Sequence, residues 1–246
     1  MKRVDGRDPT ALRQVKITPS LLRFAQGSAL VEIGATKVLC AATMAENVPP
    51  HCLGTGRGWL TAEYAMLPCS SAQRIPRDGV RGKIGGRSHE IQRVIGRSLR
   101  SVFRLDKFGE RTILIDCDVI EADGGTRTAS ITGAFVALAL AMRRLRDERK
   151  VAAGLITDFL AAVSVGIVEG QAVLDLCYLE DAQAEVDMNV ACTGTGRFVE
   201  VQGTSEGAPF DRAQLDGLLD LAQTGIAQLV SIQKEILGVE SFQGDA

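Results

Sequence analysis

The stretch "IEADGGTRTAS", residues 120–130, joins two segments of different character. Residues 113–120 form an apolar run that predicts a buried strand, and residues 128–146 form a longer apolar run that predicts a buried helix. A strand that turns through two glycines into a helix leaves the first backbone N–H groups of that helix unpaired. Because their dipoles favour negative charge, the junction predicts an anion site.

The residues of the junction favour phosphate as that anion. Gly124 and Gly125 would let a ligand approach the backbone, and Thr126 adds a hydroxyl. Arg127 adds a planar guanidinium that matches pairs of phosphate oxygens. The spacings typical of nucleotide-binding loops, GxxxxGK[ST] and GxGxxG, are absent from the junction. An ordinary strand-to-helix turn with a surface arginine remains the alternative.

A pair of carboxylates lies in the stretch "CYLEDAQAEVDMNV", residues 177–190. Asp181 is expected in a turn between two strands, and Asp187 on the second of these strands. Val186 and Met188 should then face away from Asp187, because side chains alternate along a strand. Two converging carboxylates with waters suit Mg²⁺ better than zinc. The alternative is that Asp187 caps a backbone group or pairs with an arginine.

Basic residues are concentrated between residues 74 and 104, although the whole chain has a formal net charge of −2. This window predicts an RNA or phosphate surface, and a solvated helix face is the alternative. Apolar residues at spacings of three and four predict a helix over residues 88–104 with arginines on a second face. Arg93 is expected to contact RNA or phosphate, and Arg100 and Arg104 to make structural ion pairs across subunits. The window contains Arg74, Arg77, Arg81, Lys83, Arg87, Arg93, Arg97, Arg100 and Arg104, against the acidic Asp78 and Glu90.

The composition argues against several classes of protein. The sequence contains no run of about 18 uncharged apolar residues, and its charged N-terminus has no apolar signal core, so no membrane span is expected. The six cysteines are scattered without a CxxC pair, which argues against zinc and indicates reduced thiols in the cytoplasm. With only two histidines, a Ser-His-Asp triad is poorly supported. A reaction with phosphate as nucleophile fits, since phosphate is already ionised and needs only positioning and charge neutralisation.

The chain divides into two halves, each with strands followed by a long helix. The first, residues 1–150, contains a predicted hairpin (28–33 and 37–43), the glycine-rich loop "GTGRGWLTAEY", the basic helix and the junction. The second, residues 151–240, contains predicted strands at 161–168, 172–178, 184–191 and 197–202. Its final helix is predicted to start at Asp211, with Gln214 completing a capping box. Residues 241–246 form a tail.

Six stretches resemble the ribonuclease PH family of phosphorolytic 3′→5′ exoribonucleases, which trim tRNA precursors. They are "RVDGRDPTALRQVKIT", "GSALVEIGATKVLCAAT", "GRGWLTAEYAMLP", "GRSHEIQRVIGRSLR", "CDVIEADGGTRTASITGAFVAL" and "LCYLEDAQAEVDMNVACTGTGRFVEVQGTSEGAPF". The resemblance extends over residues 3–237 and implies an α+β fold of two similar β-α modules with sheets packed on helices. It also implies that inorganic phosphate cleaves the 3′ ends of tRNA precursors, releasing nucleoside 5′-diphosphates, and that the reaction can run backwards to add nucleotides.

The resemblance further implies specific roles and partners. The phosphate ligands would be Arg87, Gly125, Thr126 and Arg127, and the residues of catalysis and metal binding would be Asp181 and Asp187. RNA contacts are expected from Arg74, Arg77, Arg93 and Arg97. The family assembles as a ring, usually a trimer of dimers, so a homohexamer in the cytoplasm is expected.

One stretch departs from the family pattern. After "EYAMLP" the family has an arginine and a basic loop containing Thr-His, whereas this chain has "CSSAQRIPRDGVRGK", with Cys69 in place of the arginine. Arg74 and Arg77 partly restore the charge of a loop that makes subunit and tRNA contacts in the family. The departure therefore concerns assembly and tRNA affinity rather than the chemistry. Two other functions stay open: a non-catalytic RNA-binding ring subunit of an exosome-like assembly, and a phosphotransferase acting on small molecules.

Overall fold

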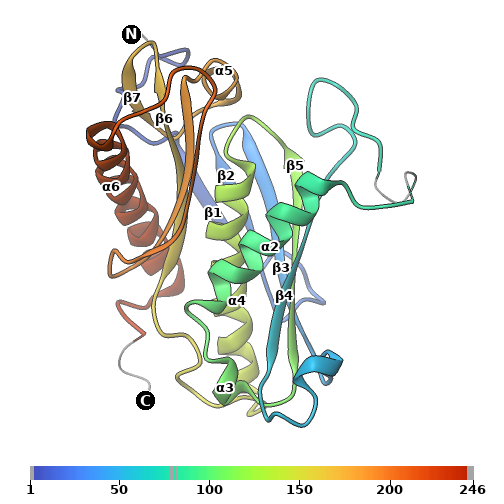
Figure 1. The fold of residues 1–246 in the computed structure, drawn as a ribbon. Coiled ribbons are helices and arrows are strands. Elements are labelled where there is room, and N and C mark those ends of the chain that lie inside the picture. The colour runs from blue at the N-terminus through green and yellow to red at the C-terminus, as the bar shows by residue number, and fades with distance from the viewer. Residues whose placement is uncertain (1–2, 78–79, 81, 243–246) are drawn as a thin grey trace.

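The computed structural model describes residues 3–77, 80 and 82–242 (Figure 1). Asp78 and Arg81 of the basic window, and residues 243–246 of the tail, lie outside the described residues. The elements are β1 (Val15–Pro19), β2 (Gly27–Ile33), β3 (Thr36–Ala45), η1 (Pro50–Cys52), β4 (Trp59–Met66), α2 (Gly86–Arg100), α3 (Leu105–Phe108), β5 (Thr112–Glu121), α4 (Thr126–Asp147), β6 (Leu160–Val168), β7 (Gln171–Leu174), α5 (Tyr178–Asp181), β8 (Val186–Thr193), β9 (Phe198–Ser205) and α6 (Arg212–Leu237).

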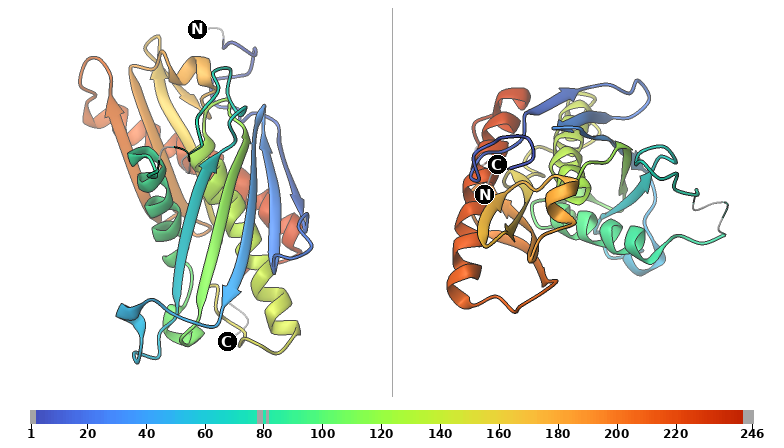
Figure 2. Two further views of the ribbon diagram at one scale, coloured as in Figure 1. Left: turned by 90° about the vertical axis from the view of Figure 1, so that its right-hand side faces the viewer. Right: turned by 90° about the horizontal axis from the view of Figure 1, so that it is seen from above.

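The strands form two sheets. The first has five strands in the order β1-β2-β3-β5-β4, and the second has four in the order β7-β6-β8-β9. The pair β4–β5 is parallel, and the other described pairs are antiparallel. Viewed from above, α4 is enclosed between the two sheets, and α6 covers the outer face of the second (Figure 2). The predicted α+β class, with sheets packed on helices, is confirmed.

Helix α4 is central because it is apolar on all sides. It packs against β2 and β3 on one side and β6 on the other. Gly133 permits the close approach, since a Cβ there would lie 2.5 Å from Val31 Cγ2 and 2.8 Å from Cys40 Sγ. By length and composition α4 could cross a membrane, but 83% of its most apolar window is buried inside the protein. It is therefore the core helix shared by both sheets.

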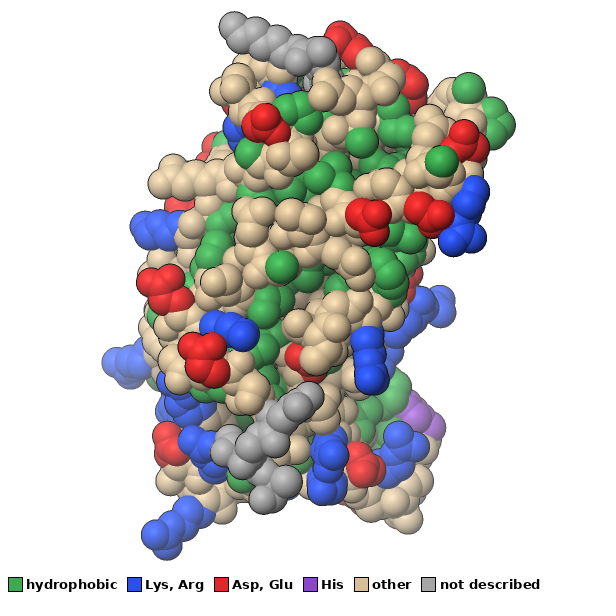
Figure 3. Space-filling view, turned by 90° about the vertical axis from the view of Figure 1, so that its left-hand side faces the viewer, with side chains coloured by type: hydrophobic (Ala, Val, Ile, Leu, Met, Phe, Trp, Pro, Cys, Tyr) green, Lys and Arg blue, Asp and Glu red, His purple; other side chains and the backbone are tan. Residues whose placement is uncertain are grey.

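Several predicted elements are confirmed. The predicted hairpin is the antiparallel pair β2–β3, and the predicted strand–helix junction is the connection from β5 to α4. The Asp211 side chain caps α6 by accepting from the backbone N–H of Gln214 at 2.8 Å. The backbone N–H of Asp211 donates in turn to Gln214 Oε1 at 2.9 Å. Acidic and basic side chains are interspersed on the face that carries α6, in line with the small net charge (Figure 3).

Two predictions about the first half are wrong. The end of the predicted glycine-rich loop is strand β4, whose alternate residues Leu60, Ala62 and Tyr64 are buried. The predicted helix over residues 88–104 ends at Arg100, because the chain turns there and the Arg104 amide donates to Leu155 O at 2.8 Å. Arg104 therefore does not share a helix face with the other arginines.

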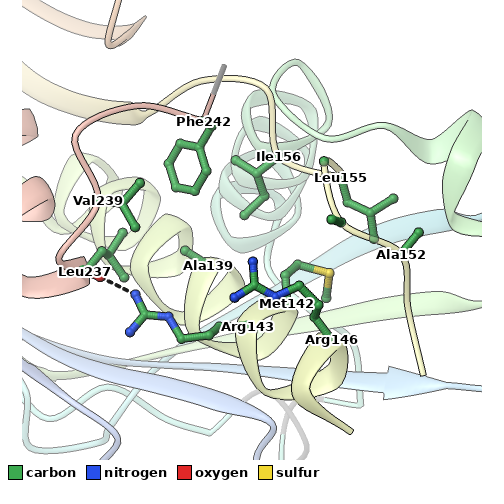
Figure 4. A pocket seen from close by; sticks show the side chains of 12 residues that line it. Ala139, Met142, Arg143, Arg146, Ala152, Leu155, Ile156, Leu237, Val239 and Phe242 are labelled. Carbon is green, nitrogen blue, oxygen red and sulfur yellow. Dashed lines mark hydrogen bonds between the residues drawn. The ribbon is translucent and has the colours of Figure 1, made fainter. Parts of the chain in front are cut away.

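A pocket near the C-terminal end of α4 lies away from the β5–α4 junction (Figure 4). It encloses about 90 Å³ between Met142, Arg143, Ile156 and the apolar side chains that follow α6. Arg143 donates to the Leu237 carbonyl there, which ties the end of α6 to α4. The pocket belongs to the packing between these helices.

Candidate active site

The N-terminus of α4 forms an open cradle. Gly125 is its N-cap in the left-handed region, with φ +67°, and no side chain caps the helix. The amides of the first turn are therefore available to an anion from outside the helix. This is the geometry expected from the sequence of the junction.

Gly124 serves the chain rather than a ligand. Its φ is +74°, and a Cβ would lie 2.6 Å from Leu176 O and 2.8 Å from Tyr178 N. The space that we expected a ligand to use is filled by the backbone that leads into α5. The start of α4 and the segment that carries Asp181 are therefore in direct contact.

Arg127 is held by two neighbours. Its Nη2 donates to Glu90 Oε2 at 2.8 Å and its Nη1 donates to Gln202 Oε1, so that α4, α2 and β9 meet at this side chain. Its Nε is buried and has no partner among the described residues. The two terminal nitrogens of the guanidinium are thus bonded within the chain, and Nε is a donor without a partner among the described residues.

Tyr64 joins the site from β4. Its hydroxyl lies 2.9 Å from Thr126 Oγ1, and the side chain is only 3% exposed. Burial raises the pKa of Tyr64, and the hydrogen bond with Thr126 and the positive charges of Arg87 and Arg127 oppose that increase. Tyr64 was not among the predicted site residues, because its segment was expected to be a loop and is strand β4. The alternating apolar residues Leu60, Ala62 and Tyr64 were the available signal.

Asp181 is the last residue of the short helix α5, not part of a simple turn as predicted. Its neighbour Glu180 is 1% exposed and pairs with the buried Arg3, 2.6 Å from Nη2 to Oε2. Burial raises the pKa of Asp181, and the charges of Arg87 and Arg127 oppose this increase. Arg3 was not predicted either, because its partner Glu180 lies 177 residues away in the sequence.

Asp187 lies on β8, where Val186 and Met188 are buried on the opposite face as predicted. Burial raises the pKa of Asp187 to about 6, and the charge of Asp181 adds to the increase, while Arg127 and Arg87 oppose it. Its Oδ1 is buried without a hydrogen-bond partner in the described part of the chain. No ion pair of Asp187 with an arginine is found among the described residues, which disfavours the structural alternative.

The two carboxylates suit a hard cation that keeps most of its waters. No group of three or more His, Cys, Asp or Glu that could hold a metal occurs within the described ranges. Mg²⁺ needs fewer protein ligands, since it is commonly held by one or two carboxylates together with waters and substrate phosphates. The unpartnered oxygen of Asp187 fits such an ion.

The predicted RNA-binding arginines differ in their surroundings. Arg93 is exposed, and Arg97 lies 3.2 Å from Glu200 in an exposed ion pair. Arg74 and Arg77 are exposed in the segment before α2, where Arg74 approaches Cys69 Sγ at 3.7 Å. Among the described residues, no hydrogen bond or ion pair joins these arginines to Thr126, Arg127 or the two aspartates.

Arg100 has partners within its own chain, and its predicted ion pair with another subunit stays a prediction. It donates to Leu60 O at 2.8 Å and lies over the Trp59 ring, 4.8 Å from its centroid. Its guanidinium therefore packs within the chain.

Comparisons with known proteins agree with this architecture. Family models for the 3′ exoribonuclease family match domain 1 at residues 11–143 and domain 2 at residues 158–225. Ribonuclease PH of Solibacter usitatus (strain Ellin6076) is 59% identical over 235 residues, 96% of this chain and 99% of the relative. Ribonuclease PH of Bacillus cereus (strain AH820) is 59% identical over 237 residues, 96% of this chain and 97% of the relative.

Two solved structures share the fold at low sequence identity. Rice (Oryza sativa) Rrp46 has a TM-score of 0.77 and 18% identity, covering 96% of this chain and 100% of its own. The Archaeoglobus fulgidus exosome with RNA bound to the active site has a TM-score of 0.77 and 23% identity, covering 94% and 92%. The chain therefore belongs to the 3′ exoribonuclease family, in which its relatives are the ribonuclease PH proteins, phosphate-dependent tRNA nucleotidyltransferases that process tRNA 3′ ends.

Proposed function

We propose that this protein shortens the 3′ ends of tRNA precursors by phosphorolysis at the cradle formed by Arg87, Gly125, Thr126 and Arg127. The observation that carries the proposal is that two arginines and two aspartates come together in the folded chain. Arg87 and Arg127 act on the same two carboxylates, Asp181 and Asp187, next to an uncapped helix N-terminus. Such an arrangement can hold an anion and a cation side by side.

Phosphate is both ligand and nucleophile in this reaction. One of its oxygens attacks the phosphorus of the terminal phosphodiester, and the bond to the 3′ oxygen of the preceding ribose breaks. The leaving oxygen takes up a proton, and the terminal nucleotide departs as a nucleoside 5′-diphosphate. Because phosphate is already ionised at neutral pH, the protein positions it and neutralises charge without a dedicated base. One phosphoester-type bond replaces another, so excess nucleoside diphosphate should drive nucleotide addition.

Asp181 and Asp187 would hold Mg²⁺, which would supply positive charge to the phosphate oxygens during transfer. The two carboxylates would be its protein ligands. Asp187 contributes a buried oxygen without another partner, and Asp181 contributes a more exposed carboxylate. Arg87 and Arg127 limit the repulsion between the two aspartates, because their charges oppose the increase of both pKa values.

RNA would reach the cradle along exposed arginines. Arg93 and Arg97 lie on α2, and Arg74 and Arg77 lie in the segment before it. Such side chains bind the RNA backbone without reading sequence. The same proposal includes a homohexameric ring, a trimer of dimers, acting in the cytoplasm. The free state of all six cysteines suits that reducing compartment.

The test is to incubate the purified protein with a 3′-tailed RNA and Mg²⁺, with and without inorganic phosphate. We expect shortening only with phosphate, and mass analysis should identify nucleoside 5′-diphosphates. Release of monophosphates without phosphate would contradict phosphorolysis. RNA binding without any shortening would favour the non-catalytic ring subunit instead. Sedimentation of the same sample tests the hexamer.

A further inference from the structure

Tyr64 and Thr126 form an isolated pair of buried hydroxyl groups. Tyr64 is 3% exposed on β4, and Thr126 is 8% exposed at the start of α4. Their oxygens lie 2.9 Å apart. Within the described part of the chain, neither hydroxyl has another hydrogen-bond partner. Each group has one proton to donate, so the direction of this bond determines what the pair can do next.

The chemistry of the two groups sets the direction. A phenol is the stronger acid and hence the better donor, and an aliphatic hydroxyl is the better acceptor. In either direction one hydroxyl proton has no acceptor among the described residues, and that is less unfavourable for Thr126, which is the more exposed of the two (8% against 3%) and lies at the uncapped start of α4. Tyr64 therefore donates to Thr126 Oγ1.

This direction leaves the Thr126 proton for an external acceptor. The hydroxyl lies in the first turn of α4, beside the uncapped amides and Arg127. We infer that Tyr64 is a positioning residue of the phosphate site: it fixes the Thr126 hydroxyl as a donor to a phosphate oxygen. The inference rests on the proposed function, since phosphate is the ligand. Tyr64 itself need not touch phosphate.

A purely structural role makes a different prediction. The same bond connects β4 to α4, and if that were its only purpose, its loss would lower stability without changing phosphate binding. The two roles are separated by replacing each hydroxyl with a side chain of similar shape. Tyr64→Phe removes only the phenol oxygen, and Thr126→Val replaces the threonine hydroxyl with a methyl group.

The experiment measures kcat/KM for inorganic phosphate, in its linear range, with saturating 3′-tailed RNA. We expect Tyr64→Phe to lower this value roughly 5- to 10-fold, the size expected for one oriented hydrogen bond. Calorimetric titration with inorganic phosphate should show the same loss of affinity. In a Thr126→Val background Tyr64→Phe should change kcat/KM by less than about twofold, because the group it orients is absent. In a Thr126→Ser background, which keeps the hydroxyl, the full effect should return.

Two variants control for unrelated effects. Tyr178→Phe removes the hydroxyl of the only other tyrosine, which is 61% exposed. Thr132→Val removes another hydroxyl of α4, which donates to the Ala162 carbonyl. Thr132→Val should lower stability and leave phosphate binding unchanged, and Tyr178→Phe should alter neither.

The outcomes separate this inference from the proposed function. If the unmodified protein needs no phosphate, the proposed function fails. If it is phosphorolytic but Tyr64→Phe leaves kcat/KM for phosphate unchanged, the positioning role is wrong. An equal effect of Tyr64→Phe with and without the Thr126 hydroxyl would also overturn it, because Tyr64 would then act through another group.

Discussion

Arg13 and Asp175 meet between the two sheets through two side-chain hydrogen bonds, 3.0 Å from Nε to Oδ2 and 2.7 Å from Nη2 to Oδ1. Both side chains are buried, at 5% and 4% exposure. Arg13 also donates to the carbonyls of Asp123 and Gly124, which lead directly into the cradle. One arginine thus connects the phosphate junction of the first sheet to the segment that precedes α5 in the second.

Asp175→Asn should destabilise the protein by about 3 kcal/mol, because it removes the buried counterion of Arg13 and leaves only the more distant and more exposed Asp123, at 3.8 Å. Asparagine is the suitable replacement, since residue 175 has φ +56° and asparagine tolerates the left-handed region. Urea unfolding followed by the fluorescence of the single tryptophan, Trp59, measures the loss. Asp216→Asn breaks the exposed pair with Arg212 and should change stability by less than about 0.5 kcal/mol. If the two variants lower stability equally, burial does not increase the contribution of the Arg13–Asp175 pair to stability.

Arg127→Lys should lower kcat/KM for phosphate roughly 30- to 150-fold, as expected for about 2–3 kcal/mol of lost charge-assisted contact. A lysine keeps the charge but cannot bind Glu90, Gln202 and phosphate with one planar fork. Arg87→Lys should act in the same direction. Arg144→Lys is the control, because its pair with Glu148 is exposed near the other end of α4. Unchanged phosphate dependence in Arg127→Lys or Arg87→Lys would remove that residue from the site.

Asp187→Asn should stabilise the protein at pH 7.5 in the presence of a chelator. Burial raises the pKa of Asp187 from 3.8 to about 6, so the folded protein holds its charge unfavourably above about pH 6. Below the unfolded pKa of 3.8, Asp187 is neutral in both the folded and the unfolded protein, and the folded protein has no penalty. As the pH rises through about 6, the buried carboxylate becomes charged and this stability is lost. The variant should therefore gain roughly 3 kcal/mol at pH 7.5 and nothing near pH 3, as measured by chemical denaturation. A gain that does not depend on pH would contradict this origin.

The same substitution should abolish Mg²⁺-dependent turnover while RNA binding persists. Asp181→Asn should have a milder effect, because Asp181 is exposed and water can replace it more easily. A magnesium titration of activity with each variant makes the comparison. Full activity of Asp187→Asn across that titration would make Asp187 a structural residue.

Arg93→Ala and Arg100→Ala should separate RNA binding from packing. RNA affinity should weaken with salt, and Arg93→Ala should reduce the log–log slope by about 0.7, the contribution of one phosphate contact on a single strand. Arg100→Ala should leave the slope unchanged but lower stability by about 1–2 kcal/mol, because Arg100 packs on Trp59 and bonds the Leu60 carbonyl. If the two variants behave alike, the arginines of α2 form one continuous surface.

The parts of the fold that the sequence predicted are those with local signals. Periodicity and two glycines located the β5–α4 junction, and Asp211 with Gln214 located the start of α6. The pairing of β4 with β5 was not predicted, because it joins segments that are distant in the sequence. Tyr64, which lies on β4, was therefore not recognised as a site residue. The partners of the site residues are equally remote: Tyr64 and Thr126 are 62 residues apart, and Glu90 and Arg127 are 37 apart. Residue types alone suggested an anion site at the junction, but only the tertiary structure shows which side chains lie beside it.

The close approach at Gly124 has a consequence for how the reaction begins. Backbone packs against backbone there, so the spacing between the start of α4 and the start of α5 is set by the main chain and not by adjustable side chains. A site of this kind is preorganised, and binding energy is not consumed in closing a hinge between the two sheets. The contact between these two segments forms when the chain folds, before any substrate binds.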